Sequence, residues 1–304
     1  MTDQRRLSRT LGLGYVVIFV IANIIGSGVY KKIAPMADEL NSSVWILLVW
    51  VAGGVITLFG ALSNAELAGM LADTGGDYVY LKKIYKRFFS FLYGWSLFAV
   101  IQTATIASLA YVMVQSLNSI IPIPDLFPAL HDFSIGGVFF PFQDFGIKLT
   151  AIIVIMLLTL LNMSGLRSGA WTGKALFYFV CAGLLVIIIA GLANGNPKPD
   201  NFMNFRELGS SPVTLSSFYT AMLAAFWAYQ GWVSVGFIGG EIKNANRNIP
   251  KGIAIGVLIV IGVYVLVNLA YMRIMSIPQL VGVHEAGNQI AAIEAIRSLW
   301  GHGG

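Results

Sequence analysis

Seven long apolar runs dominate this sequence, and short polar segments separate them. In order along the chain, the runs cover residues 11–30, 44–70, 91–117, 147–161, 175–192, 215–240 and 253–275. Most reach the length of roughly 20 residues that a helix needs to cross a bilayer. Of the 304 residues, 57% are hydrophobic and only 11% are charged, which leaves little charged surface for a soluble domain. The pattern therefore predicts an all-α integral membrane protein.

The runs are apolar throughout and do not alternate between apolar and polar residues. Residues 252–264 illustrate this, whereas a membrane barrel shows alternating segments of about 10 residues. The first run follows a basic N-terminus but is too long for a signal peptide, and no small-x-small cleavage site closes it. We therefore expect this run to remain in the protein as its first spanning helix.

Basic residues gather in alternate polar segments, at 5–9, 82–87, 167–174 and 243–251. The segment 118–145 has no Lys or Arg and carries three Asp residues, as an outer loop does. This bias places the N-terminus in the cytoplasm and predicts a multi-pass protein of the plasma or inner membrane. The same topology accounts for the formal net charge of +5, so no nucleic-acid partner is expected.

Two of the runs carry a glycine-containing interruption in mid-membrane, one in the first run and one in the sixth. The residues are Gly26, Ser27 and Gly28 in the first run, and Ala228, Tyr229, Gln230 and Gly231 in the sixth. Glycine has low helix propensity and accepts unwound backbone. A transporter with two inverted five-helix repeats has its broken helices at positions one and six. The sequence predicts this fold in a single membrane domain, 1–304, with 1–194 as the first repeat and 215–304 as an incomplete second repeat.

Unwound backbone in a bilayer is tolerated only where it lines a cavity and meets a polar ligand. The half-helix after the first interruption begins with free N–H groups and the positive end of its dipole, which suit a carboxylate. The carbonyls freed around Ala228, Tyr229 and Gln230 suit an ammonium group. A neutral amino acid fits between the two without a buried charged side chain, whereas a charged substrate usually requires an ionisable residue near mid-membrane. Neutral amino acids are the expected substrates, and a cationic amino acid or a polyamine is the alternative.

Other polar and aromatic residues in the runs are further candidates. Trp227 flanks the second interruption and is expected to form a gate. Asn23, Gln102 and Tyr111 are candidates for lining the pore, although interhelical hydrogen bonding is the commoner role of such residues. Glycines outside the interruptions are instead expected at close helix contacts, among them Gly53, Gly54 and Gly191.

Other functional classes find less support in the sequence. A membrane-embedded enzyme would need paired carboxylates, a Ser–His pair or metal-spaced histidines inside the runs, and none is present. The three histidines lie outside the runs, so we expect no metal site, no cofactor and no catalytic residue. A seven-helix receptor is the alternative that the helix count suggests, but the charge bias places the N-terminus inside and such receptors have it outside.

Several motifs are spread over nearly the whole chain. They are NIIGSGVY at 23–30, ELAGM at 66–70, GGDYVY at 75–80, WAYQGW at 227–232 and GEIKNANRNIPK at 240–251. Together they resemble the amino acid–polyamine–organocation superfamily, and most closely its L-type amino-acid transporter branch. The resemblance implies secondary transport by alternating access, with substrate carboxylate binding at 26–28, amino-group binding at the second interruption and an aromatic gate at Trp227. A coupling proton or an exchanged amino acid is the other small partner that it implies.

The resemblance also implies about twelve helices around a ten-helix core of two repeats. Seven runs are present here, so the second repeat is expected to lack its last three helices. Backbone of the first, third and sixth helices that should pack against the eighth and tenth would then face lipid, which costs several kcal/mol per unsatisfied group. We therefore expect that the 304-residue chain does not transport on its own.

Overall fold

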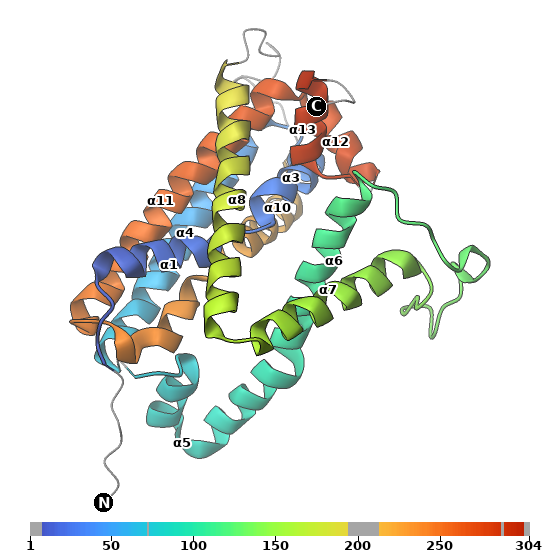
Figure 1. The fold of residues 1–304 in the computed structure, drawn as a ribbon. Helices are drawn as coiled ribbons and strands as arrows, with labels where there is room; N and C mark the ends of the chain where they lie inside the picture. Colours follow the sequence, from blue (N-terminus) through green and yellow to red (C-terminus); the bar gives the residue numbers. More distant parts are fainter. Residues whose placement is uncertain (1–7, 72, 194–212, 287–288, 301–304) are drawn as a thin grey trace, which may run out of the picture.

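The computed structural model describes residues 8–71, 73–193, 213–286 and 289–300 (Figure 1). Six described segments are helical, long enough and apolar enough to cross a membrane: Ser43–Met70, Asp77–Asn118, Phe145–Met163, Trp171–Ala193, Leu215–Glu241 and Ala245–Ile274. A seventh apolar helix, α1 (Leu13–Ile24), is shorter because its run is interrupted. These seven segments match the seven predicted runs, so the prediction of a helical membrane protein is confirmed.

The first run and the ten residues after it form three helices. After α1 come α2 (Gly28–Lys31) and α3 (Ile33–Leu40). Ile25 has extended backbone with φ −69° and ψ 109°, which ends α1. Lys32, between α2 and α3, keeps helical angles, so α2 and α3 form one nearly continuous half of the broken helix.

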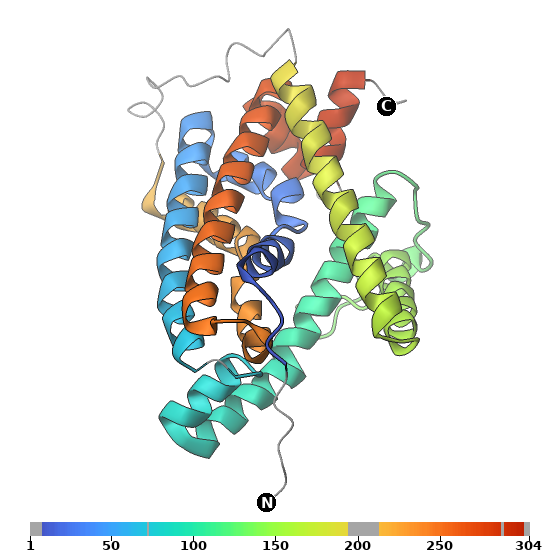
Figure 2. The same ribbon diagram turned by 60° about the vertical axis from the view of Figure 1, so that its left-hand side comes forward.

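The main core is a bundle that we define as α1 to α4, α10, η4 and α11. Its remaining members are α4 (Ser43–Met70), α10 (Leu215–Ala228), the 3-10 helix η4 (Trp232–Glu241) and α11 (Ala245–Ile274). α4 and α11 lie side by side along their length, and α1 crosses against α11 (Figures 1 and 2). The bundle therefore contains both interrupted helices, including the segments before and after each interruption.

Glycines lie along the contacts between helices of this bundle, and we call these lines of contact glycine seams. A Cβ atom added at Gly252 would lie 2.4 Å from Val16 Cγ1, and one at Gly256 would lie 2.6 Å from Val20 Cγ1. This is a small-x-x-x-small spacing, which lets helices approach closely in a membrane. Gly53 and Gly54 of α4 likewise face α10 and α11, and Gly191, which lies outside the bundle, also faces α11; an added Cβ at these positions would meet Ala225, Ile261 and Ala270 at 2.9 Å or less. The predicted packing role of these three glycines is confirmed.

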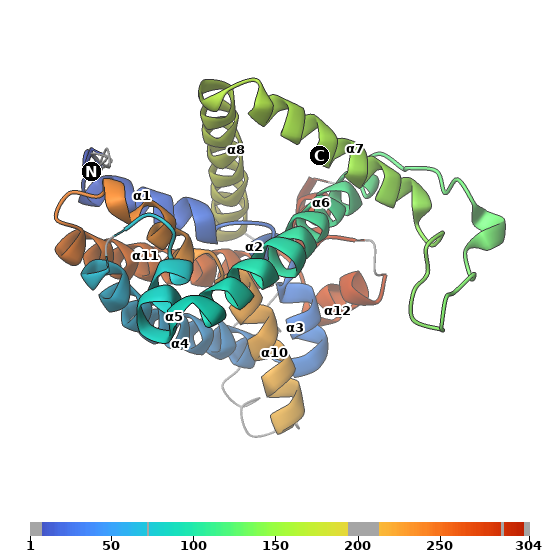
Figure 3. The ribbon, with the colours of Figure 1, turned by 90° about the horizontal axis from the view of Figure 1, so that it is seen from below.

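The segment Asp77–Ala193, which we call the arm, packs less closely. It comprises α5 (Asp77–Ser96), the π-helix η1 (Leu97–Ile101), α6 (Gln102–Asn118), the 3-10 turn η2 (Pro128–Leu130), α7 (Phe145–Met163) and α8 (Leu166–Ala193). α6 and α7 share a small apolar cluster of Ala110, Val114, Ile147 and Ala151 that is separate from the main core. Seen from below, α7 runs across the space between α6 and α8, away from the bundle (Figure 3).

The third spanning segment differs from its predicted bounds. Helix begins at Asp77, whereas the apolar run begins at residue 91. The basic residues 82–87 lie within α5, because Lys and Arg have good helix propensity and a helix does not end where its apolar face ends. Lys86 interrupts the regular geometry with φ 69°.

Two short helices follow α11. α12 (Ile277–Glu285) begins with a capping box between Ser276 and Gln279, and α13 (Ala291–Trp300) follows it. α12 packs against α3, so this segment covers one end of the bundle. The predicted repeat boundary at residue 194 and the basic residues at the N-terminus lie outside the described residues.

Candidate functional site

The first interruption is non-helical over Ile25, Gly26 and Ser27. Within the described part of the chain, the backbone N–H groups of Gly26 and Ser27 have no hydrogen-bond acceptor. The Ser27 hydroxyl is buried and also lacks a partner there. Burial of unpaired polar groups is costly, so this cluster of unpaired groups has the character of a ligand site.

The second interruption follows α10. Tyr229 and Gln230 form a turn, and Gly231 has φ 124°, a conformation that favours glycine. The chain then continues as the 3-10 helix η4 instead of an α-helix. The breaks that the glycine content predicts are therefore present in both helices.

The two interruptions touch one another. A Cβ atom added at Gly28 would lie 2.7 Å from Cα of Ala228. One added at Gly231 would lie 2.1 Å from the carbonyl oxygen of Asn23. Both positions require glycine for this approach, and the structure thereby brings the predicted binding residues of the first and sixth helices together.

Tyr264 of α11 links the two interruptions, and the sequence did not single it out. Its hydroxyl lies 3.1 Å from the carbonyl oxygen of Ile24 and 2.9 Å from that of Ala228, the last residue of each preceding helix. The side chain is fully buried. These carbonyls have lost their intrahelical partners, and the hydroxyl is within donor distance of both.

An aromatic cluster supports this tyrosine. Trp50 of α4 packs edge-on against Tyr229 and Tyr264, with ring centroids 5.8 Å and 5.3 Å away. The Tyr229 hydroxyl donates to the Trp50 carbonyl at 3.0 Å. Tyr229 thus faces α4 from the second interruption, and its ring stacks obliquely on Tyr264 at 5.0 Å. A tyrosine in mid-membrane needs a partner for its hydroxyl, which is the one signal that points to Tyr264 from sequence.

Trp227 lies at the rim of the site and is 36% exposed. The ammonium group of Lys32 lies 4.5 Å from the centroid of its ring, in the geometry of a cation–π contact. The adjacent Lys31 donates instead to Gln115 of α6. Trp227 therefore has a charged neighbour on the helix half that follows the first interruption.

The three candidates for pore lining occupy different places. The backbone carbonyl of Asn23 lies next to Gly231 of the second interruption. The Asn23 side-chain amide donates to the Phe19 carbonyl within α1 at 2.8 Å. Gln102 is exposed on α6. The Tyr111 hydroxyl donates to Asp144 at 3.1 Å, between α6 and α7. The structure does not bring Gln102 or Tyr111 to the interruptions, and their role as pore lining stays a prediction.

The far ends of the broken helices are joined by backbone pairing. The N–H groups of Thr10 and Leu11 lie 2.9 Å and 3.0 Å from the Glu241 carbonyl, and the Lys243 N–H donates to the Leu11 carbonyl at 2.8 Å. This pairing fastens the start of α1 to the end of η4. On the other side of the interruptions, α3 and α10 pack together, and α12 contacts α3.

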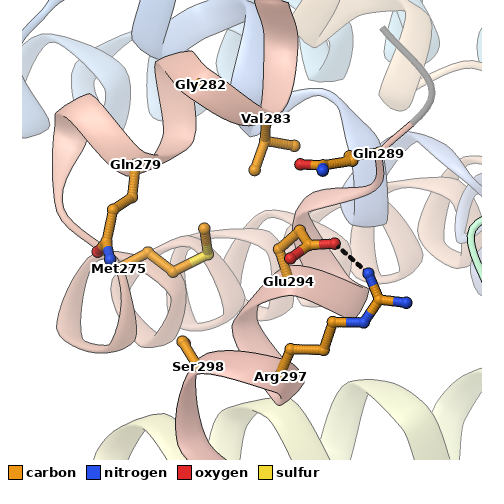
Figure 4. A pocket seen from close by; sticks show the side chains of 8 residues that line it. All are labelled: Met275, Gln279, Gly282, Val283, Gln289, Glu294, Arg297 and Ser298. Carbon is orange, nitrogen blue, oxygen red and sulfur yellow. Dashed lines mark hydrogen bonds and ion pairs between the residues drawn. The ribbon is translucent and has the colours of Figure 1, made fainter. Parts of the chain in front are cut away.

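A cavity of about 310 Å³ lies between α12 and α13 (Figure 4). Arg297 crosses its floor, where it donates to Glu294 at 2.7 Å and to the Ser119 carbonyl at 2.6 Å. The arginine is therefore occupied in joining α13 to the end of α6. Neither here nor elsewhere in the described residues do three or more His, Cys, Asp or Glu side chains gather as metal ligands.

Known proteins resemble this chain over most of its length. A family model described as amino acid permease matches residues 11–297. The serine/threonine exchanger SteT of Bacillus subtilis is 28% identical over 300 residues, which are 99% of this chain and 63% of that protein. The human large neutral amino acids transporter small subunit 2 is 32% identical over 295 residues, 94% of this chain and 50% of its own length.

The human b(0,+)-type amino acid transporter 1 is 29% identical over 278 residues, which cover 90% of this chain and 53% of that protein. The chain thus spans between half and two thirds of the length of these relatives. The resemblance to the amino acid–polyamine–organocation superfamily and to its L-type branch is confirmed by these matches. On the family model and its coverage, the chain belongs to the amino acid permease family.

Proposed function

We propose that this chain carries the substrate site of a secondary transporter for neutral amino acids, working by alternating access with a coupling proton or in exchange for another amino acid. The single observation that carries the proposal is the contact between two interrupted helices, at Gly28 against Ala228 and at Gly231 against Asn23. Two sets of bare peptide groups face one another there, and they are suited to the two ends of a zwitterion.

The carboxylate end belongs to the first interruption. The unpaired N–H groups of Gly26 and Ser27 and the buried Ser27 hydroxyl are donors that a carboxylate accepts from. They precede the nearly continuous helix of α2 and α3, whose dipole has its positive end here. Charge-assisted hydrogen bonds of this kind are about twice as strong as neutral ones.

The ammonium end belongs to the second interruption. The Tyr264 hydroxyl lies within hydrogen-bond distance of the carbonyls of Ile24 and Ala228 and can donate its one hydrogen to either, which refines the expectation that all the freed carbonyls await the substrate. Each carbonyl oxygen has two lone pairs, so a carbonyl that accepts from Tyr264 can accept from an ammonium group as well. In this arrangement Tyr264 sets the spacing of the two interruptions, and the substrate completes their hydrogen bonding.

Neutral substrates are favoured over cationic ones by the surroundings of the interruptions. In the described residues, no Asp, Glu, Lys or Arg side chain hydrogen-bonds or pairs with 26–28 or 228–231. A substrate with a charged side chain would be left without a counter-ion at this depth. The names of two relatives, a serine/threonine exchanger and a transporter of large neutral amino acids, support the same class.

The proposal extends to topology and class. It includes an inverted repeat with α1 to α8 as its first half, a cytoplasmic N-terminus, a site in the plasma or inner membrane, and no enzymatic activity. Support comes from the charge bias of the polar segments, the position of both interruptions in the first helix of each half, and the transporter relatives. Completion of the second repeat by three further helices stays a prediction from the resemblance.

A binding experiment on the purified chain in lipid nanodiscs tests the proposal. Labelled leucine is displaced with leucine, alanine, serine, arginine or putrescine. We expect the neutral amino acids to compete and arginine and putrescine to be weaker by about tenfold or more, the cost of an unpaired charge. Gly28→Val, which collides with Ala228, should abolish this binding, whereas Gly262→Val, with open space around it, should not. Binding of arginine or putrescine without binding of neutral amino acids would contradict the proposal.

A further inference from the structure

Four basic residues lie close together in the middle of α5. They are Lys82, Lys83, Lys86 and Arg87, and all four are exposed. Within the described part of the chain, none of their side chains has an ion-pair or hydrogen-bond partner. Residues 78–124 contain no Asp or Glu, so the neighbouring sequence supplies no counter-charge. This part of α5 therefore carries four cations that the described residues leave unneutralised.

The helix α5 folds back on itself at these residues. The Tyr93 hydroxyl donates to a carboxylate oxygen of Asp77 at 3.2 Å. A Cβ atom added at Gly94 would lie 3.2 Å from the ring of Tyr78. In a straight helix, residues 16 positions apart would be separated by about 24 Å along the axis. The chain therefore reverses midway between these pairs, at Lys86, where φ is 69° and ψ is −169°.

We define residues 82–89, on both sides of this reversal, as the basic tip. Its aromatic side chains Tyr85, Phe88 and Phe89 are 57%, 69% and 52% exposed. The Phe89 ring packs edge-on against the other two, with its centroid 5.8 Å from that of Tyr85 and 5.4 Å from that of Phe88. α5 lies at the lower end of the molecule in Figures 1 and 2, the opposite end from α12 and α13. The basic tip thus presents cations and an aromatic cluster together at one end of the protein.

The place of the basic tip along the spanning segment indicates what it contacts. The apolar run 91–117 begins two residues after Phe89, so the tip lies where the helix leaves the hydrocarbon core and enters the headgroup layer. Aromatic side chains are favoured at that depth. Clusters of four or more Lys and Arg beside a spanning helix are attracted to anionic headgroups, by about fivefold for each cation near the surface.

We propose that the basic tip is a docking surface for anionic phospholipids, whose phosphate groups pair with its lysines and its arginine while its aromatic rings lie at the top of the acyl chains. Lipid headgroups carry the negative charge at this depth of a bilayer, and they supply the counter-charge that the described residues lack. The assignment of these lipids to the cytoplasmic leaflet rests on the proposed topology, whereas the chemistry of the surface does not.

The test measures lipid binding by the purified chain in detergent. Native mass spectrometry counts the bound lipids while phosphatidylglycerol or phosphatidylcholine is titrated. We expect phosphatidylglycerol to bind about tenfold or more tightly than phosphatidylcholine. The double variant Lys83→Gln with Arg87→Gln should weaken phosphatidylglycerol binding by about tenfold or more and leave phosphatidylcholine binding unchanged. Both side chains are exposed, so the variant should fold, and thermal unfolding in the same detergent checks this.

The double variant Lys243→Gln with Arg247→Gln is the matched control. It removes the same two residue types at the same spacing, and both residues are exposed. Residues 238–263 contain no Phe, Tyr or Trp, so this pair lacks the aromatic component of the surface. We expect the control to weaken phosphatidylglycerol binding by about twofold at most, because salt screens exposed charges at a distance. sn-Glycerol 3-phosphate, which has a phosphate group but no acyl chains, should not displace the lipid.

Each outcome decides for or against the basic tip as a lipid surface. A loss confined to Lys83→Gln with Arg87→Gln supports it. Equal affinity of the wild type for the two lipids overturns it, and so do equal losses in the two double variants, because general charge would then explain the effect. Displacement by sn-glycerol 3-phosphate also overturns it and indicates a site for free phosphate. Leucine binding plays no part in these measurements, so a failure of the proposed function would leave their outcome unchanged.

Discussion

The bundle and the arm are equally apolar but differ in how they pack. The apolar windows of α11 and of Trp171–Ala193 have the same mean hydropathy of 2.7, yet 44% of the first window is buried and 17% of the second. Asp77–Asn118 is only 11% buried. In the bundle, glycines admit the neighbouring helices, whereas large side chains of the arm such as Phe98 and Phe179 stay exposed.

This difference teaches that hydropathy places a helix in a membrane without deciding what it packs against. Lipid tails are as apolar as leucine, so apolar side chains alone give helices no reason to associate. Close backbone approach and buried hydrogen bonds do give one, and the bundle has both. The following substitutions test whether these features explain the difference, beginning with the largest expected effect.

Gly256→Leu should separate α1 from α11. The new side chain would start 2.6 Å from Val20, so one helix must move, at a cost of about 2–3 kcal/mol of unfolding free energy. Thermal unfolding in nanodiscs measures the loss. Gly262→Leu is the control on the same helix, since nothing lies within 4 Å of its added Cβ atom. Similar losses in both variants would show that helix propensity, and not the glycine seam, sets the stability of the bundle.

Tyr264→Phe should come next, with a loss of about 1–2 kcal/mol, because the two buried carbonyls at the interruptions lose the one hydroxyl hydrogen that either can accept. Tyr271→Phe is matched in residue type, helix and burial, but its hydroxyl has no partner within the described residues, so its removal should be neutral or stabilising. Unfolding free energies of the two variants give the comparison. The bridging role fails if Tyr271→Phe is as destabilising as Tyr264→Phe.

Tyr111→Phe should have the smallest effect, about 0.5 kcal/mol, because it removes one hydrogen bond to Asp144 in the loosely packed arm. We expect the change to stay local, as faster amide hydrogen exchange at the start of α7 with unchanged exchange in α11. Tyr178→Phe serves as the control, since that side chain is 70% exposed. Accelerated exchange throughout α11 would mean that arm and bundle form one cooperative unit.

Much of this fold follows from local sequence. Seven apolar runs predict the membrane helices, and Gly26, Gly28 and Gly231 predict where two of them are interrupted, because both signals lie within a few residues of what they determine. The seam at Gly252 and Gly256 is also visible as a spacing, but its partners on α1 are not. A spacing identifies a contact face, and only the folded chain supplies the other helix.

The candidate site depends on long-range contacts that the sequence does not indicate. Tyr264 is 36 residues from Ala228 and 240 from Ile24, so nothing near it indicates that its hydroxyl reaches both carbonyls. Lys32 next to Trp227 is a contact of the same long-range kind. The prediction that Gln102 and Tyr111 line the pore depends on their being polar residues in apolar runs. That pattern does not distinguish a helix face toward the interruptions from a face toward other neighbours.

The backbone pairing of Thr10 and Leu11 with Glu241 and Lys243 has a mechanical consequence. α1 and η4 are fastened at their far ends, while their near ends adjoin the non-helical residues Ile25 and Gly231. Because of this pairing, a tilt of either helix would move the other, so the two helices would rotate together about the two interruptions. In the proposed transport cycle, opening on that side of the membrane would then require α1 and η4 to move together.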